Sequence, residues 1–119
     1  MSMKIAIVGS RSFKDYELLK NEVEKFITEN SLEEVTIVSG GAVGADTLAE
    51  QFAAEMGYKT VIFIPDRKTH GREACRIRNT DIVETGEVVF AFWDGISTGT
   101  KDSIDKAQNL NKSVFIHLF

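Results

Sequence analysis

Residues 38–46, which read VSGGAVGAD, hold the residue types best suited to binding an anion. Glycine permits positive φ angles and lets a ligand come close to main-chain N–H groups. The free amides and the dipole at the start of a following helix favour a phosphate. This first glycine-rich turn, residues 39–46, therefore predicts ligand contacts from Ser39, Gly40, Gly41, Gly44 and Asp46. A tight turn that needs glycine only for its geometry is the alternative, and Asp46 either meets ribose hydroxyls or caps its own helix.

Two further turns carry compatible chemistry. Gly9, Ser10 and Arg11 combine a close backbone approach with a hydroxyl and with a guanidinium, which binds phosphate bidentately. Residues 94–100, the second glycine-rich turn, read DGISTGT and lack the Gly-Lys-Ser/Thr ending of a Walker loop. Here anion contacts are predicted from five residues, with helix capping by a hydroxyl as the alternative: Asp94, Gly95, Ser97, Gly99 and Thr100.

A basic segment at residues 67–78 contains five of the chain's 14 Lys and Arg residues and one acidic residue. In a chain of net charge −4, such a segment indicates a local anion site. We predict that Arg78 and Asn79 face the ligand, whereas the basic residues before position 75 are solvated.

No metal or cofactor is predicted. His70 and His117 are far apart in the sequence and have no metal-ligand spacing. The G-x-G-x-x-G spacing of dinucleotide-binding proteins is missing after the first apolar run, which argues against a large dinucleotide cofactor. The single cysteine, Cys75, has no obvious catalytic partner and is interpreted as an inert thiol.

Alternating strands and helices must position these turns. Near-continuous apolar runs predict buried strands at residues 4–8, 35–38, 59–64, 88–92 and 113–117. Apolar spacings of three and four predict helices between residues 12 and 30, from 45 to 56, from about 71 to about 84, and between 100 and 111. Ser12 and Asp15 fit a capping box at the start of the first helix. Residues 66–71 are predicted to form a loop.

This alternation predicts an α/β fold with a five-stranded parallel sheet in one Rossmann-like, doubly wound domain covering residues 1–119. If the winding reverses after the third strand, the first and fourth strands become neighbours. Ligands in such sheets bind beyond the carboxyl ends of the strands at this switch point. We therefore expect the three turns to meet at one edge of the sheet.

Composition limits the function classes. A chain of 119 residues with 43% hydrophobic residues is long enough for one domain and its core. Its acidic balance makes general nucleic-acid binding unfavourable, because that affinity depends largely on basic charge. A single cysteine excludes an internal disulfide, and no apolar run approaches membrane-spanning length. We expect a cytoplasmic protein with no membrane partner.

Taken together, four ordered motifs resemble the YspA/YpsA-related SLOG proteins. They are residues 9–13 (GSRSF), residues 39–46 (SGGAVGAD), the pair Arg78-Asn79, and residues 92–100 (FWDGISTGT). The resemblance covers nearly the whole chain. It implies a Rossmann-like domain that binds a nucleotide or a nucleotide-derived ligand. It also implies that self-association is common among small relatives.

Two relatives of that family define the alternatives. LOG phosphoribohydrolases cleave the base from nucleoside monophosphates with a P-G-G-x-G-T-x-x-E loop, whereas this chain has Ser103 at the glutamate position. Asp102 or Asp105 would have to replace the glutamate, and a shifted carboxylate on a helix points elsewhere. The DNA-processing protein DprA has a similar glycine-rich turn in a domain that binds single-stranded DNA.

The sequence thus predicts a binder of a nucleotide or nucleotide-derived small molecule. In this hypothesis, amides of both glycine-rich turns hold the phosphate, Arg11 and Arg78 neutralise it, and Asp46 or Asn79 meets the sugar. The first alternative is a nucleoside-monophosphate N-glycosidic hydrolase, and the second is single-stranded nucleic-acid binding. Whether any reaction is catalysed stays open, as does the formation of a homo-oligomer.

Overall fold

A parallel five-stranded sheet in the order β3-β2-β1-β4-β5 forms the centre of the molecule. The computed structural model describes residues 1–119. The strands are β1 (Ser2–Gly9), β2 (Glu34–Ser39), β3 (Lys59–Ile62), β4 (Val88–Trp93) and β5 (Ser113–Leu118). Because β1 pairs in parallel with both β2 and β4, the winding reverses between β3 and β4. The predicted α/β fold with a doubly wound parallel sheet is confirmed.

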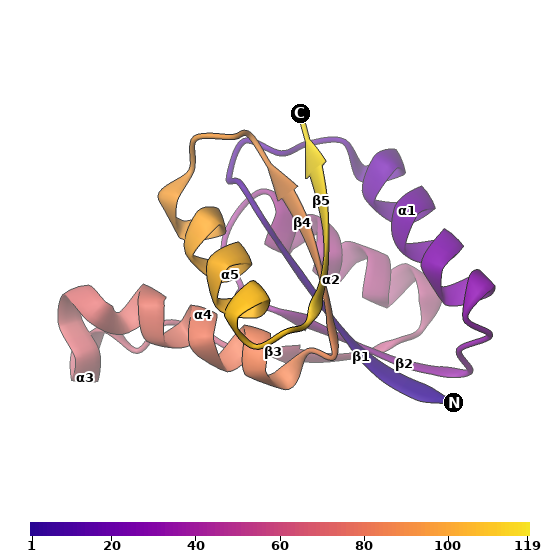
Figure 1. Ribbon diagram of the computed structural model, residues 1–119, viewed down its shortest axis with the longest axis horizontal. Helices are drawn as coiled ribbons and strands as arrows, with labels where there is room; N and C mark the ends of the chain where they lie inside the picture. Colours follow the sequence, from indigo (N-terminus) through magenta and orange to yellow (C-terminus); the bar gives the residue numbers. More distant parts are fainter.

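Helices cover both faces of this sheet (Figure 1). The helices α1 (Tyr16–Glu29) and α2 (Ala45–Met56) pack on one face, and α4 (Ala74–Thr85) and α5 (Thr98–Asn109) pack on the other. The side chains of β1 explain the division, because successive residues of a strand point to opposite faces. Ile5 and Ile7 belong to the core beneath α1 and α2, whereas Ala6 and Val8 belong to the core beneath α4 and α5. All four residues are buried, so β1 contributes to two cores at once.

Three local predictions are wrong. The N-cap of α1 is Asp15, whose carboxylate accepts the N–H of Leu18 at 3.1 Å, so Ser12 and Asp15 form no capping box. β3 ends at Ile62, two residues earlier than predicted. The predicted loop at residues 66–71 contains the short helix α3 (Arg67–His70), followed by the 3-10 turn η1 (Gly71–Glu73).

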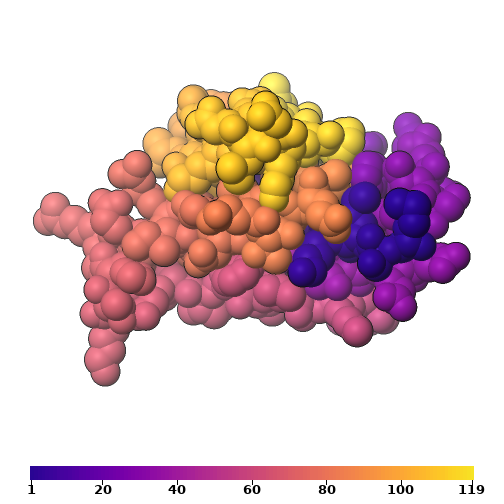
Figure 2. Space-filling view, turned by 60° about the horizontal axis from the view of Figure 1, so that its bottom comes forward, coloured from indigo at the N-terminus to yellow at the C-terminus, as the bar shows by residue number.

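The N-cap of α3 is Asp66, whose carboxylate accepts the N–H of Thr69 at 3.1 Å. Aspartate after proline at positions 65 and 66 is therefore the capping signal that starts this helix. In Figure 1, α3 projects from one end of the molecule beyond α4, and Figure 2 shows the same projection in the space-filling view. The first part of the basic segment, α3 with η1 (residues 67–73), therefore forms an arm beside the body of the protein.

Lys112, just before β5, holds the carboxyl end of α4. Its ammonium donates to the carbonyl oxygens of Val83 at 2.6 Å, Glu84 at 2.8 Å and Gly86 at 2.6 Å. A cation at this position also meets the negative end of the helix dipole. No helix of the structure is both long enough and apolar enough to cross a membrane.

Candidate functional site

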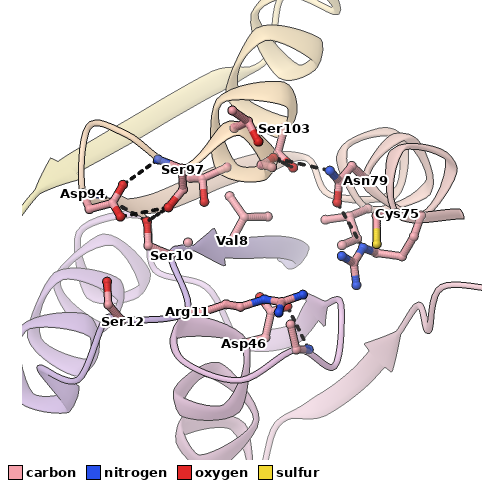
Figure 3. A pocket seen from close by; sticks show the side chains of 17 residues that line it. Val8, Ser10, Arg11, Ser12, Asp46, Cys75, Asn79, Asp94, Ser97 and Ser103 are labelled. Atoms are coloured by element: carbon pink, nitrogen blue, oxygen red, sulfur yellow. Dashed lines mark hydrogen bonds between the residues drawn. The ribbon is translucent and has the colours of Figure 1, made fainter. Parts of the chain in front are cut away.

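A polar cavity of about 520 Å³ lies beyond the carboxyl ends of β1 and β4 (Figure 3). Only four of its 17 lining residues are hydrophobic, which favours a polar ligand. The predicted site residues that line it are Gly9, Ser10, Arg11, Asp46, Arg78, Asn79, Asp94, Ser97, Gly99 and Thr100. The predicted site residues outside the lining are Ser39, Gly40, Gly41, Gly44 and Gly95. That any of these residues contacts a ligand stays a prediction.

Seven lining residues are absent from the predicted site: Val8, Ser12, Ala42, Cys75, Ile82, Thr98 and Ser103. Thr98 lies within the second glycine-rich turn, and Ser103 lies about one helical turn after Thr100 on α5. Because both are beside predicted site residues, the sequence could have placed them at the cavity. Val8 and Ile82 are core residues that also line the cavity; Val8 directly precedes Gly9, and Ile82 lies one helical turn after Arg78 and Asn79 on α4.

In the first glycine-rich turn, the carboxylate of Asp46 occupies the place of an anion. Its Oδ2 accepts the N–H of Ala42 at 3.1 Å, and the side chain of Thr47 donates to the Ala42 carbonyl oxygen at 3.0 Å. The N–H of Ala45 is also engaged, because it donates to the Ser10 carbonyl oxygen at 3.4 Å. These contacts use the N–H groups of Ala42 and Ala45 inside the protein.

Asp46 is a buried carboxyl without an ion pair. It is 7% exposed, and no cation lies within salt-bridge distance of it. Burial raises the pKa of Asp46 to about 6, although the Ala42 N–H and the charge of Arg78 act in the opposite direction. The charge of this cavity wall thus changes near neutral pH.

Two glycines of the first turn have positive φ angles and close neighbours within the protein. Gly44 has a φ of 82°, and an added Cβ would lie 2.5 Å from the carbonyl oxygens of Ser10 and Arg11. Gly41 has a φ of 71°, and its added Cβ would lie 2.5 Å from the side chain of Ile64. Gly44 therefore lets the first turn pack on residues 9–11, whereas Gly41 faces the chain that leaves β3.

In the second glycine-rich turn, Asp94 holds the loop that precedes α5. Its carboxylate accepts the N–H groups of Ser97 at 2.7 Å and Ile96 at 2.8 Å, and Ser97 Oγ donates to it at 2.9 Å. These hydrogen bonds, led by the Ser97 N–H, lower the pKa of Asp94 to about 2. Ser10 Oγ accepts the N–H of Asp94 at 3.1 Å, which joins this turn to the end of β1.

The start of α5 leaves its donors free. The N–H groups of Thr98, Gly99 and Thr100 have no hydrogen-bond partner in the protein, and the first amide used is that of Lys101, which donates to the Ser97 carbonyl. The Thr100 side chain is 5% exposed and makes no hydrogen bond. Because no fully buried side-chain oxygen in the protein is unpaired, the Thr100 hydroxyl must open onto the cavity that it lines. Three unpaired amides and the unpaired Thr100 hydroxyl thus belong to residues 98–100, which line the cavity.

Two arginines reach the cavity from opposite sides. Arg11 is exposed, forms no ion pair or hydrogen bond through its side chain, and extends beside Asp46 in Figure 3. The guanidinium of Arg78 donates through Nη1 to the Gly40 carbonyl oxygen at 2.6 Å and through Nε to Asn79 Oδ1 at 3.0 Å. Arg11 is thus free to meet a ligand, whereas Arg78 is already held.

The carboxylates considered as glutamate substitutes lie outside the cavity lining. Asp102 forms an ion pair with Lys106 at 2.9 Å, and Asp105 forms one with Lys101 at the same distance. Ser103, which is 2% exposed, lines the cavity where a hydrolase glutamate is expected. The cavity therefore contains two carboxylates, Asp46 and Asp94.

The basic residues of the arm are exposed, as predicted for solvated side chains. Arg67, Lys68 and Arg72 are exposed. Arg67 Nη2 lies 3.5 Å from the sulfur of Cys75, which lines the cavity and is half-buried. The arm therefore begins at the cavity rim.

Comparisons with known proteins agree with this fold. Residues 3–70 match the family model described as YspA, cpYpsA-related SLOG family. No curated protein matches the chain. Among solved structures, DNA processing protein A from Helicobacter pylori, reported for its single-stranded DNA binding mode, has a TM-score of 0.72 and 22% identity. That match covers 96% of this chain and 64% of the other.

Two further solved structures share the fold. DNA processing protein A from Streptococcus pneumoniae has a TM-score of 0.72 and 26% identity, covering 96% of this chain and 50% of the other. The structural genomics target TM1055 has a TM-score of 0.68 and 20% identity, covering 94% and 72%. The chain thus spans 64% and 50% of the lengths of the two DNA processing proteins.

Proposed function

The chain belongs to the YspA, cpYpsA-related SLOG family, and we propose that it binds a nucleotide or nucleotide-derived ligand whose phosphate lies at the start of α5. The observation that carries this proposal is the donor set of Thr98, Gly99 and Thr100, whose amides are unused, with the buried Thr100 hydroxyl beside them. Free amides and the positive end of a helix dipole together stabilise a phosphate. The second glycine-rich turn is therefore the phosphate site in this proposal.

The first glycine-rich turn has a different role in the proposal. Since the Asp46 carboxylate already accepts the Ala42 N–H, a phosphate there would have to displace it. We assign Asp46 and Asn79 to the sugar instead, because both line the cavity and a carboxylate or an amide accepts hydrogen bonds from hydroxyl groups. Arg11 supplies charge from the open side. The proposal thus places the phosphate at one wall and the sugar between the two turns.

Calorimetric titration with AMP tests the site. Hydrogen bonds to charged groups contribute about 1.5–3 kcal/mol, so Arg11→Ala should weaken AMP binding roughly tenfold or more. Arg78→Ala should have a similar effect, with a melting curve to show that loss of the Gly40 contact leaves the protein folded. Arg67→Ala, an exposed position outside the lining, is the control and should bind as the wild type does. Equal affinity in all four proteins would remove both arginines from the site.

The identity of the ligand needs a separate measurement. Mass spectrometry of small molecules released from the purified, denatured protein should detect a phosphorylated nucleoside derivative. Detection of a ligand without phosphate would contradict the role given to the start of α5.

Geometry disfavours the N-glycosidic hydrolase. Ser103 cannot act as a carboxylate, and Asp102 and Asp105 are engaged in ion pairs outside the lining. We therefore expect little or no free base to be released from AMP. Clear turnover that is lost in Asp102→Asn or Asp105→Asn would support the hydrolase instead.

One observation supports single-stranded nucleic acid as a second candidate ligand. The exposed cations of the arm start at the cavity rim, where Arg67 meets Cys75. The Helicobacter pylori neighbour binds single-stranded DNA. If this chain does the same, its affinity for an oligonucleotide should fall steeply with salt and should drop in Arg67→Ala. AMP binding, which is confined to the cavity, should be unchanged in that variant.

A further inference from the structure

A line of hydrogen-bonded side chains joins the two glycine-rich turns. Asn79 Nδ2 donates to Asp102 Oδ2 at 3.1 Å and to the Gly99 carbonyl oxygen at 3.4 Å. Arg78 Nε donates to Asn79 Oδ1 at 3.0 Å, and its Nη1 donates to the Gly40 carbonyl oxygen at 2.6 Å. The line therefore runs from the start of α5, through α4, to the first turn. Figure 3 shows the Asn79 side chain between its partners on the two helices.

The chemistry of the partners fixes the orientation of the Asn79 amide. A carboxylate and a carbonyl only accept hydrogen bonds, and a guanidinium only donates them. The NH₂ group must therefore face Asp102 and Gly99, which leaves the oxygen to face Arg78. Asn79 is 6% exposed, so a reversed amide would leave buried polar atoms unpaired.

Lys106 supports the acidic member of this line. Its ammonium donates to Asp102 Oδ2 at 2.9 Å and to the carbonyl oxygen of Arg76 at 2.7 Å. The Asp102 and Lys106 side chains are 23% and 26% exposed, so solvent screens this pair less than it screens a fully exposed pair. Asp102 is thus held in place from α5 while it holds Asn79 on α4.

We infer that Asp102 is a positioning residue, which acts through Asn79 to set the direction in which Arg78 presents its guanidinium to the cavity. The inference rests on the proposed ligand site, because Asp102 itself does not line the cavity. Its role is to fix the position of Asn79 Oδ1, the acceptor to which Arg78 Nε donates. No other acidic residue pairs with Asn79.

A matched control exists on the same helix. Asp105 forms an ion pair with Lys101 at 2.9 Å and four residues apart, as Asp102 does with Lys106. The Asp105 pair has no contact with Asn79, and its side chains are about half exposed, at 51% and 59%. Both variants therefore lose an ion pair on α5, and only Asp102→Ala also loses a contact with Asn79.

The first measurement needs no ligand. Nitrogen-15 NMR can follow exchange of the Arg78 Nε–H with water, with the signal assigned by its absence in Arg78→Ala. Asp102→Ala should speed this exchange by up to about fivefold, the factor that corresponds to complete loss of the hydrogen bond from Arg78 Nε to Asn79 Oδ1. Asp102→Asn, which keeps an acceptor oxygen, should restore part of the protection, and Asp105→Ala should behave as the wild type. Wild-type exchange in folded Asp102→Ala would overturn the inference, whatever the protein binds.

The second measurement is a double-mutant cycle with AMP. Asp102→Ala should weaken binding on its own and should add nothing in the background of Arg78→Ala, because it acts through that guanidinium. Independent, fully additive losses would overturn the positioning role. A wild-type protein that does not bind AMP would contradict the proposed function, while the NMR measurement still decides the role of Asp102.

Discussion

The first and second glycine-rich turns each connect a strand to a helix, and each contains an aspartate that accepts N–H groups of its own turn. In the first turn, Asp46 lies inside the protein, and burial raises its pKa to about 6. In the second turn, Asp94 is half-buried, and its hydrogen bonds lower its pKa to about 2. The same residue type thus meets opposite electrostatic conditions in two turns of similar sequence.

The two aspartates differ in which backbone amides they leave unpaired and therefore available to a ligand. Asp46 accepts the N–H of Ala42, so a ligand can reach that amide only if the carboxylate moves away. Asp94 accepts only the amides before α5, so those of Thr98, Gly99 and Thr100 are free. Glycine content alone therefore does not identify a phosphate site. The aspartate of each turn removes the amides that it accepts from a ligand's reach, and in the second turn it leaves the amides of residues 98–100 unpaired.

The largest expected effect comes from Gly44→Ala. The substitution forces a side chain onto a backbone with φ of 82° and brings Cβ to 2.5 Å from two carbonyl oxygens. Left-handed strain of about 1–2 kcal/mol and an overpacking cost of about 1–3 kcal/mol should together lower the free energy of unfolding by roughly 2–5 kcal/mol. Urea unfolding measures the loss.

Gly99→Ala is the control for that prediction. An alanine Cβ at Gly99 has no neighbour within 4 Å, and the residue lies inside a helix, so stability should be unchanged or slightly higher. Equal stability of Gly44→Ala and the wild type would show that the first turn is not constrained by its packing on residues 9–11.

The next effect concerns Asp46→Asn. Because the native pKa of about 6 lies above the ordinary value of 3.8, the folded protein holds this proton more tightly than the unfolded chain does. The associated stability is complete below about pH 4 and is lost as pH rises through about 6. At pH 8, the free energy of unfolding of Asp46→Asn should therefore exceed that of the wild type by about 1–3 kcal/mol. Near pH 4, the two proteins should differ little. Unfolding curves at both pH values measure this.

Asp94→Asn should show the reverse dependence. Its native pKa of about 2 lies below 3.8, so its ionised form stabilises the protein above about pH 4, and that contribution disappears as pH falls through about 2. The variant should be less stable than the wild type at neutral pH and should approach it in acid. Parallel pH profiles for the two variants would remove the electrostatic contrast between the turns.

The smallest effect concerns the hydroxyl that opens onto the cavity. Thr100→Val removes one hydrogen bond to the charged phosphate, worth about 1.5 kcal/mol at the low end of the range, and should weaken AMP binding about tenfold. Thr47→Val removes a hydroxyl of α2 that donates to the Ala42 carbonyl oxygen of the first turn, outside the phosphate site, and should leave AMP affinity unchanged. Calorimetry on both variants checks which turn contacts the ligand. A larger loss in Thr47→Val would assign the phosphate to the first turn.

Much of the fold could be predicted because its strands are apolar almost throughout. β1 and β4 are buried on both faces, so a hydrophobic run alone locates them and the alternation with helices gives the topology. The arm was missed because α3 has no apolar stripe and buries no residue. Its start depends on one local contact, from Asp66 to the N–H of Thr69.

The site could be predicted at the level of strand ends, but not at the level of donors. Topology alone brings residues 9–11 and the two glycine-rich turns to one edge of the sheet. Whether an amide is free depends on the orientation of nearby side chains such as that of Asp46. The line from Asp102 to Arg78 joins residues on two helices, and no spacing in the sequence reveals it.

Lys112 makes the two ends of α4 unequal. The carboxyl end has three carbonyl oxygens held by one ammonium, whereas the amino end follows Glu73, which provides no side-chain cap, and continues into the exposed arm. Partial unfolding should therefore begin at the arm and stop within the helix. A protease that cuts at Arg67 or Lys68 should nick the native protein there first and leave the sheet associated as a single particle.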